Sequence, residues 1–252
     1  KISADELCTH FDKSLRAAVT SQSNITVSSS ASVKELYGYN EGLFFVQDTA
    51  STLVSSLINR DVFKTQKPII ADTCSCPGGK SFSAAINLAD ECEIHSYDLH
   101  ANRLKLVSDG AKRLGLKSIS VKAADGRTGD PELFGKADAA ICDVPCSGLG
   151  VIAKKPDIRY KDLSDIERLP EVQLAILKTS ANYVKRGGFI VYSTCTLRNA
   201  ENNDVVNAFL SENGDFELCP TGLPGDKDGM CTFLPHKTHT DGFFAAKLVK
   251  KA

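Results

Sequence analysis

The chain lacks long apolar runs, and nothing in it resembles a leader segment. None of its 252 residues belong to an apolar stretch that approaches the ~18 residues of a membrane-spanning helix. The N-terminus, Lys1 to Glu6, has neither the charged nor the apolar region of a signal peptide, and it lacks an initiator methionine. These absences predict a cytoplasmic protein with no membrane partner, and a trimmed or partial chain.

A disulfide framework and a zinc motif are missing as well. The nine cysteines are odd in number and do not cluster into short loops, which favours reduced thiols. Cys74 and Cys76 lie close together, but their C-x-C spacing and the lack of a histidine at ligand spacing argue against zinc. We therefore expect no metal, and we expect five thiols to be structural: Cys8, Cys92, Cys142, Cys219 and Cys231.

Bulk positive charge is also absent. The formal net charge is −1, so a nucleic-acid partner would have to be held by a local patch. A basic loop with one aromatic residue, running from Lys154 to Lys161, is a candidate for gripping phosphates around a looped-out base. A second basic group, formed by Lys112, Arg113 and Lys117, is predicted to be solvated helix surface.

Strand and helix patterns alternate from residue 68 onwards. Regular alternation with short apolar strands predicts an α/β fold, a Rossmann-like, doubly wound and mostly parallel sheet covered on both faces. The tail predicts a closing antiparallel pair, 216–218 with 243–249, separated by a loop. The predicted strands are 68–71, 94–97, 119–121, 137–142 and 189–192, and the predicted helices are 79–88, 101–114, 169–184 and 201–210.

The first 42 residues have a different pattern. Leu7, Phe11, Leu15 and Ala18 stand at helical spacing and predict an amphipathic helix over about the first 20 residues. The Ser-rich stretch that follows predicts a loop or weak edge strands, and a helix is expected at 47–57. We therefore divide the chain into a small appendage, 1–42, and a main domain, 43–252.

A Gly-rich turn, D-T-C-S-C-P-G-G-K over 72–80, follows the first strand of the main domain and opens a helix. Glycines let the backbone approach a ligand, and a helix N-terminus offers free N–H groups. A Walker P-loop would need glycine where Cys74 stands, and a NAD-type G-x-G-x-x-G is absent. Asp98, at the end of the second strand, is placed to accept hydrogen bonds from ribose hydroxyls, and Asp125, after the third, from an adenine amine. Without a pyrophosphate loop, this pocket favours S-adenosylmethionine over a dinucleotide.

Two further strands end in cysteine motifs, D-V-P-C-S-G over 143–148 and Y-S-T-C-T over 192–196. Residues just past the C-termini of parallel strands line the ligand crevice, so both thiols are expected in one cleft beside Asp143. That arrangement suits covalent attack on a substrate better than core packing. Val-Pro-Cys stands where amino-group methyltransferases have Pro-Pro-aromatic, which favours methylation of carbon. Glu201 and Asn202 are expected to begin a helix.

Together these motifs resemble the RNA cytosine-C5 methyltransferases, and most closely the bacterial Fmu (Sun) branch, which methylates small-subunit ribosomal RNA. The resemblance spans roughly residues 41–250 and includes Asp241 to Leu248 near the C-terminus. Ser75 and Cys76 depart from the two alanines usual in the family. The family's N-terminal RNA-binding helical domain is missing, and residues 1 to about 40 resemble a remnant of its small RNA-recognition-like subdomain.

The resemblance implies a class I methyltransferase domain that acts on RNA, with Cys195 as nucleophile, Cys146 assisting product release, and Asp143 and Lys80 in supporting catalytic roles. A thiolate added at C6 makes C5 of cytosine nucleophilic, and cysteine is suited to that task. The RNA contacts expected are Lys154, Lys155 and Arg159. The residues expected to bind S-adenosylmethionine are Cys74, Ser75, Cys76, Pro77, Gly78, Gly79, Lys80, Asp98, Arg103, Asp125, Gly126 and Asp143.

Two alternatives stay open on the sequence. A DNA cytosine-C5 methyltransferase would use Cys146, in Pro145-Cys146, as its nucleophile. A non-catalytic RNA-binding or ribosome-assembly factor would keep the fold without the reaction.

Overall fold

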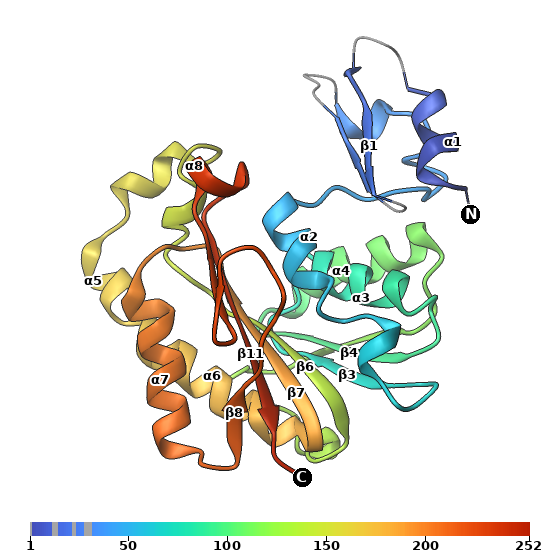
Figure 1. Cartoon of the computed structure of the whole chain (residues 1–252). Coiled ribbons are helices and arrows are strands. Elements are labelled where there is room, and N and C mark those ends of the chain that lie inside the picture. Colours follow the sequence, from blue (N-terminus) through green and yellow to red (C-terminus); the bar gives the residue numbers. More distant parts are fainter. Residues whose placement is uncertain (1, 12–14, 22–23, 28–31) are drawn as a thin grey trace.

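The computed structural model describes residues 2–11, 15–21, 24–27 and 32–252. A nine-stranded sheet of order β5-β4-β3-β6-β7-β11-β10-β9 forms its centre, with β8 paired to β11 (Figure 1). The parallel half consists of β3 (Ile69–Asp72), β4 (Glu93–Asp98), β5 (Ile119–Ala123), β6 (Ala137–Asp143) and β7 (Val184–Thr194). The mostly parallel sheet that the alternation predicts is therefore confirmed.

The C-terminal part of the sheet is antiparallel. β11 (Phe243–Lys250) runs antiparallel to β7, and β8 (Phe216–Leu218) pairs with β11 as the tail pattern predicts. The prediction of a plain loop between them is wrong, because the segment contains β9 (Asp226–Lys227), β10 (Met230–Phe233) and the short helix α8 (Pro235–Thr238). Cys231 and Phe233 alternate with half-buried neighbours along β10 and are buried against the core, which stabilises this extra strand.

Helices cover both faces of the sheet. α2 (Thr49–Ser55) and α3 (Gly79–Asn87) pack on one face, in the core that contains Val54 and Ala84. α6 (Leu169–Tyr183) and α7 (Asn203–Glu212) pack on the other, in the core that contains Leu177 and Phe209. The order of helices and their burial confirm the doubly wound arrangement.

Helix α4 (Ala101–Leu114) illustrates how the sequence dictates these elements. Its buried residues, Leu104, Val107, Ala111 and Leu114, recur at spacings of three and four and so lie along one side of the helix. The helix ends at Gly115, whose φ of 74° is the left-handed conformation that closes a helix C-terminus. Of the residues that the structure describes, none belongs to a helix that is long and apolar enough to cross a membrane.

The N-terminal prediction is wrong in part. Helix α1 runs only from Ala4 to Thr9, and the chain then forms a hairpin of β1 (Ala18–Ser21) and β2 (Asn24–Thr26). Positions 12–14 of the expected helix lie outside the described residues. The β-branched residues Val19, Thr20, Ile25 and Thr26 favour strands, and the pairing of the two strands prevails over the helical spacing of the apolar residues.

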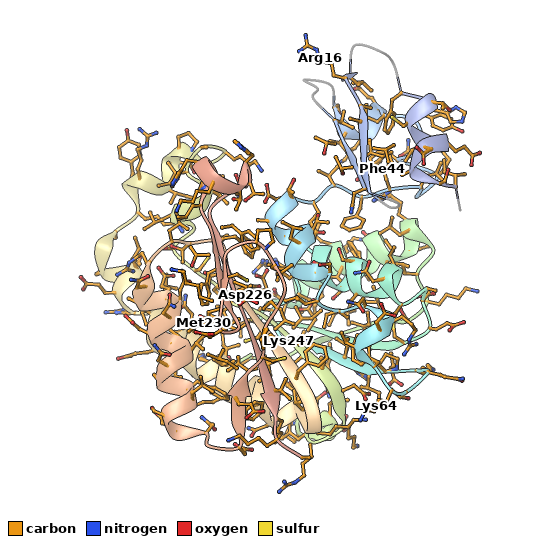
Figure 2. The ribbon with its side chains drawn as sticks, in the orientation of Figure 1. Arg16, Phe44, Lys64, Asp226, Met230 and Lys247 are labelled. Carbon is orange, nitrogen blue, oxygen red and sulfur yellow. The ribbon has the colours of Figure 1, made fainter. Side chains whose placement is uncertain are left out.

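Arg113 connects this N-terminal segment to the main domain and corrects the expectation that it is solvated surface. Its guanidinium donates hydrogen bonds to the carbonyl oxygens of Tyr39 and Phe44 at 2.6 and 3.0 Å, and it lies 4.0 Å from the centre of the Tyr39 ring. Figure 2 labels Phe44 at the junction between the two parts. One arginine on α4 therefore fixes the linker where the appendage meets the main domain.

We expect Arg113→Met to loosen that junction without unfolding the main domain. Loss of both hydrogen bonds and of the contact with the Tyr39 ring should make the 37–45 segment several-fold more sensitive to chymotrypsin. Lys112→Met, which changes the exposed neighbouring residue on the same helix, is the matched control. Cleavage of the Arg113 variant at the control rate would contradict this role.

Candidate active site

The predicted site residues meet at one edge of the sheet. The strand order reverses between β3 and β6, and in parallel sheets ligands bind outside the C-terminal strand ends at such a switch point. The Gly-rich turn follows β3, Asp98 ends β4, and the two cysteine motifs follow β6 and β7. The topology thus places the expected cofactor residues beside the expected catalytic residues.

The Gly-rich turn has the backbone conformation of a ligand cradle. The Ser75 N–H donates to the Tyr97 carbonyl at 2.8 Å, which holds the turn against β4. Gly78 has a φ of 113°, and a Cβ there would lie 2.4 Å from the Phe82 ring, so only glycine fits. Helix α3 begins at Gly79 and leaves its first N–H groups without partners in the helix. Ser75 Oγ is buried and lacks a hydrogen-bond partner among the described residues, which suits contact with a polar ligand.

The carboxylates expected to bind adenosine are held in place by neighbouring groups. Asp98 is buried, accepts from the His100 N–H at 3.0 Å, and has Arg103 Nη1 3.5 Å from its Oδ2. Asp125 is bonded at both oxygens by the side chain of Arg127. A Cβ on Gly126 would lie 3.4 Å from the Thr73 carbonyl, so the third strand's turn packs closely against the Gly-rich turn. These residues fit an adenosine-bearing cofactor.

The thiols of Cys146 and Cys195 lie in contact. Cys146 Sγ is 3.0 Å from Cys195 Sγ, and the Cys195 backbone N–H donates to Cys146 Sγ at 3.3 Å. Both cysteines are free and partly exposed. The expectation that the β6 and β7 motifs bring their sulfur atoms into one cleft therefore agrees with the geometry.

The cysteines differ in acidity. The hydrogen bond with Cys146 lowers the pKa of Cys195, with a further contribution from the nearby Lys80 ammonium. The same hydrogen bond, together with burial, raises the pKa of Cys146 well above its ordinary value. Burial raises the pKa of Cys74 as well, and it raises that of Cys76 to about 11. Of the thiols in the cleft, Cys195 is the one whose thiolate is favoured.

Asp143 and Lys80 form an ion pair next to the thiols. Lys80 Nζ lies 2.6 Å from Asp143 Oδ2, and Ser193 Oγ donates to Asp143 Oδ1 at 2.6 Å. Lys80 Nζ also donates to Ser51 Oγ at 3.1 Å and lies 5.1 Å from the centre of the Phe243 ring. Lysine and serine together fix the direction of the Asp143 carboxylate.

The sequence analysis missed Ser193, although a signal for it exists. Ser193 is the second-last residue of β7, and Cys195 directly follows the end of that strand. The pairing of β6 with β7 then sets Ser193 opposite Asp143. A register argument from the two motifs would have found this contact.

A pair of glycines brings three segments together behind the cysteines. The Gly150 N–H donates to the Cys195 carbonyl at 3.0 Å, and the Gly242 N–H donates to the Gly150 carbonyl at 2.9 Å. A Cβ on Gly150 would lie 1.9 Å from the Gly242 carbonyl oxygen, a distance that no side chain tolerates. The loop after Cys146 therefore packs directly against both the Cys195 loop and the start of β11.

The basic loop presents its three expected RNA contacts differently. Lys154 Nζ lies between two carboxylates, 2.6 Å from Asp48 and 2.7 Å from Asp241, whereas Lys155 and Arg159 are exposed.

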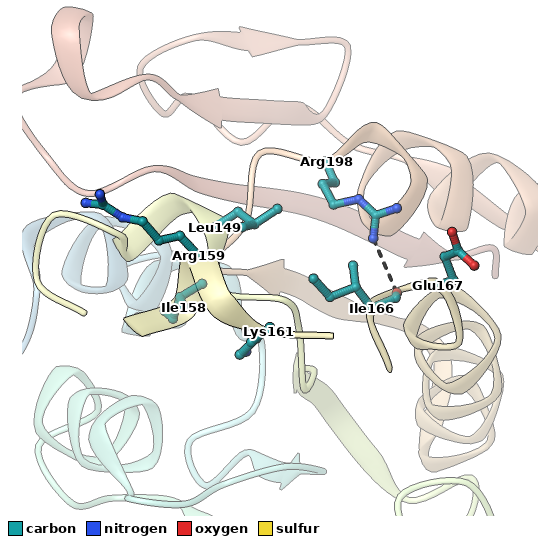
Figure 3. Close-up of a pocket in the computed structure, with 7 residues that line it drawn as sticks. All are labelled: Leu149, Ile158, Arg159, Lys161, Ile166, Glu167 and Arg198. Carbon is teal, nitrogen blue, oxygen red and sulfur yellow. Dashed lines mark hydrogen bonds between the residues drawn. The ribbon is translucent and has the colours of Figure 1, made fainter. Parts of the chain in front are cut away.

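A small cavity lies beside this loop, and Figure 3 shows Arg198 donating across it to the Ile166 carbonyl at 3.3 Å. The cavity is lined by Leu149, Ile158, Arg159, Lys161, Ile166, Glu167 and Arg198.

The fold and the site define a class of enzyme. A doubly wound sheet with an antiparallel C-terminal strand, and a Gly-rich turn beside two thiols at its switch point, describe the fold of the class I S-adenosylmethionine-dependent methyltransferases.

A family model described as "16S rRNA methyltransferase RsmB/F" matches residues 63–249. The chain belongs to this family, which confirms the resemblance seen in its motifs.

Known proteins give the same result. The "Probable ribosomal RNA small subunit methyltransferase B" of Bacillus subtilis is 39% identical over 226 residues, which are 84% of this chain and 49% of that protein. The "Ribosomal RNA small subunit methyltransferase B" of Escherichia coli O1:K1 is 36% identical over 88% of this chain and 50% of its own length. The chain thus spans about half the length of these relatives.

A solved structure extends the comparison to the bound cofactor. NSun6 from Pyrococcus horikoshii, solved with the S-adenosylmethionine analogue SFG, has a TM-score of 0.77 and 30% identity, covering 91% of this chain and 60% of its own.

We expect the acidity difference between the two thiols to be visible in their reactivity. A lowered pKa gives Cys195 more thiolate than Cys146 near pH 7, so iodoacetamide should alkylate Cys195 several-fold faster, as measured by peptide mass spectrometry. Cys146→Ala removes the hydrogen-bond donor and should slow the labelling of Cys195. Cys219→Ala, remote from the pair, serves as the control. Faster labelling of Cys146 would contradict the assignment.

Proposed function

We propose that this chain transfers a methyl group from S-adenosylmethionine to C5 of a cytosine in RNA, most specifically small-subunit ribosomal RNA, through a covalent bond between Cys195 Sγ and C6 of the base. The observation that carries the proposal is the contact between Cys146 and Cys195 at the edge where the cofactor cradle ends. A second thiol that donates to the first favours a thiolate in a site partly shielded from water.

The reaction starts with addition of the Cys195 thiolate to C6, which moves the electrons of the C5–C6 double bond onto C5 and the N3–C4 edge of the ring. Asp143, held by Lys80 and Ser193, is assigned to hydrogen-bond the N3 or N4 edge of the base, and the positive charge of its partner Lys80 offsets the negative charge that develops on the ring. When bound, S-adenosylmethionine supplies an electrophilic methyl group, and C5 acquires it. C5 then loses its proton, the S–C6 bond breaks, and the double bond and the Cys195 thiolate are restored.

Cys146 is assigned the removal of the C5 proton. Its pKa is raised chiefly by its hydrogen bond to Cys195, so it stays protonated while Cys195 is a free thiolate. Once Cys195 is bonded to carbon, the sulfur is a thioether and accepts that hydrogen bond only weakly. The largest cause of the raised pKa is then removed, so Cys146 can release its thiol proton to solvent, and the resulting thiolate is assigned to accept the proton from C5. The two thiols thus act in the order that the reaction requires, with Cys195 first as nucleophile and Cys146 afterwards as base.

RNA as the substrate is supported by the relatives' names and by the basic loop. Because Lys154 is neutralised by Asp48 and Asp241, the phosphate contacts are assigned mainly to Lys155 and Arg159. Tyr160, which follows Arg159, is 85% exposed and is suited to stacking on an unpaired base. Lys154 then contributes by fixing the loop that carries these residues.

The two alternatives are less well supported. A DNA methyltransferase using Cys146 as nucleophile would attack with the thiol whose pKa is raised by its hydrogen bond to Cys195 and by burial, and that thiol is the poorer source of thiolate. A non-catalytic assembly factor would have no need for a paired thiol next to an ordered Lys80–Asp143 ion pair.

We expect the covalent step to be trapped by RNA that contains 5-fluorocytosine, because fluorine at C5 cannot leave as the proton does. With S-adenosylmethionine present, the chain should form an adduct that survives denaturing electrophoresis, and Cys195→Ala should abolish both the adduct and methylation. Cys146→Ala should accumulate adduct even with unmodified RNA, since release is blocked. Cys219→Ala is the control with both cysteines intact.

The same assay separates the alternatives. An adduct unaffected by Cys195→Ala would refute the nucleophile assignment, and transfer to a DNA oligonucleotide in place of RNA would favour the DNA enzyme. Calorimetry that detects no S-adenosylmethionine binding would favour the non-catalytic factor.

A further inference from the structure

A buried polar cluster lies behind the two cysteine loops, and neither the motif analysis nor the proposed reaction assigns it a role. Its centre is the pair Glu201 and Asn202, which are 0% and 1% exposed. Glu201 is the last residue of a short 3-10 helix, Asn199–Glu201, and Asn202 connects that helix to α7. A carboxylate without solvent contact is costly unless several donors compensate it. The groups that hydrogen-bond the Glu201 carboxylate therefore indicate its role.

Glu201 holds both neighbours of Cys146. Its Oε2 accepts from the Ser147 backbone N–H at 2.8 Å and from Gln173 Nε2 at 2.9 Å. Gln173 Nε2 also donates to the Pro145 carbonyl at 2.9 Å. The residues on either side of Cys146 are thus fixed directly or through one side chain, while Arg198 Nη1 contacts the other carboxylate oxygen at 3.3 Å.

Asn202 does the same for Cys195. Thr194 Oγ1 donates to Asn202 Oδ1 at 2.5 Å, and Asn202 Nδ2 donates to the Thr196 carbonyl at 3.0 Å. The two cysteine loops are also joined to each other, because Ser147 Oγ and Thr196 Oγ1 lie 2.8 Å apart. Two consecutive residues therefore hold the flanking residues of the two thiols.

We infer that Glu201 and Asn202 are positioning residues that together set the contact between the Cys146 and Cys195 thiols, and we call this pair the thiol clamp. The inference goes beyond the proposed function. Within that function, the clamp keeps Cys195 in the thiolate form that attacks the base. Neither residue touches the substrate's reacting atoms in this role. Their effect reaches the chemistry through the position of Cys146 Sγ relative to Cys195 Sγ, 3.0 Å apart.

The test measures the two thiols without RNA. Iodoacetamide labelling of Cys195, resolved by peptide, is followed against pH in the intact chain and in Glu201→Ala and Asn202→Ala. Loss of the clamp frees one loop, weakens the thiol–thiol hydrogen bond, and should move the labelling midpoint of Cys195 upward, towards that of Cys146→Ala. The double variant Glu201→Ala with Cys146→Ala should show no further rise, because both changes remove the same interaction.

Two variants separate positioning from a general structural role. Glu201→Gln keeps an acceptor for the Ser147 N–H, so its Cys195 midpoint should lie close to that of the wild type. Glu217→Ala changes an exposed residue of β8 and should leave the midpoint unchanged. A folded Glu201→Ala variant whose Cys195 midpoint equals that of the wild type would overturn the inference. If Glu201→Ala does not fold, Gln173→Leu removes the hydrogen bonds of Gln173 to Pro145 and to Glu201 while it leaves the bond from the Ser147 N–H in place, and an unmoved midpoint there overturns the inference equally.

Failure of the proposed function is distinguishable from failure of the clamp. A chain that methylates no RNA and still shows the upward shift in Glu201→Ala would leave the clamp standing and remove the reaction. Methylation of RNA together with an unchanged Cys195 midpoint in Glu201→Ala would leave the reaction standing and remove the clamp.

Discussion

The hydrogen bond between the Cys146 and Cys195 thiols is the interaction on which the rest of the site depends. It is a short contact between two partly shielded sulfur atoms, and it separates their acidities in opposite directions. Neither thiol would differ in this way if it stood alone in the same cleft, because burial by itself raises the pKa of both. The division of work between nucleophile and base that we propose follows from that difference.

The sheet makes this contact possible because β6 and β7 are neighbours in it, although about 40 residues separate them in the chain. Their register sets Asp143 opposite Ser193, so each motif leaves its strand at the same level. The strand register brings the two cysteine loops together, and buried hydrogen bonds then fix the positions of the thiols within them. Around the thiols, these come from side chains of α6 and of the segment that precedes α7.

The sequence alone predicted much of this molecule, and the residues that escaped prediction have a common cause. The positions of the parallel strands, the Gly-rich turn and the two cysteine motifs could be predicted because each depends on a local sequence pattern. Arg113, Lys154 and Glu201 were assigned by their own neighbourhoods, as surface, RNA contact and helix start. The structure pairs each with groups distant in the chain: Arg113 with Phe44, Lys154 with Asp48, and Glu201 with Ser147. Such partners are set by tertiary packing and have no local signature.

The close approach of Gly150 and Gly242 has a consequence for the order in which the molecule is completed. Gly242 lies just before β11, the strand that pairs with β7, and it follows every parallel strand of the sheet in chain order. The loop after Cys146 therefore rests on a segment that is synthesised later than all of these parallel strands. A growing chain can assemble its parallel strands while that loop is still unsupported, and removal of the residues from Gly242 onwards should disturb the contact between the cysteine loops while leaving the earlier strands.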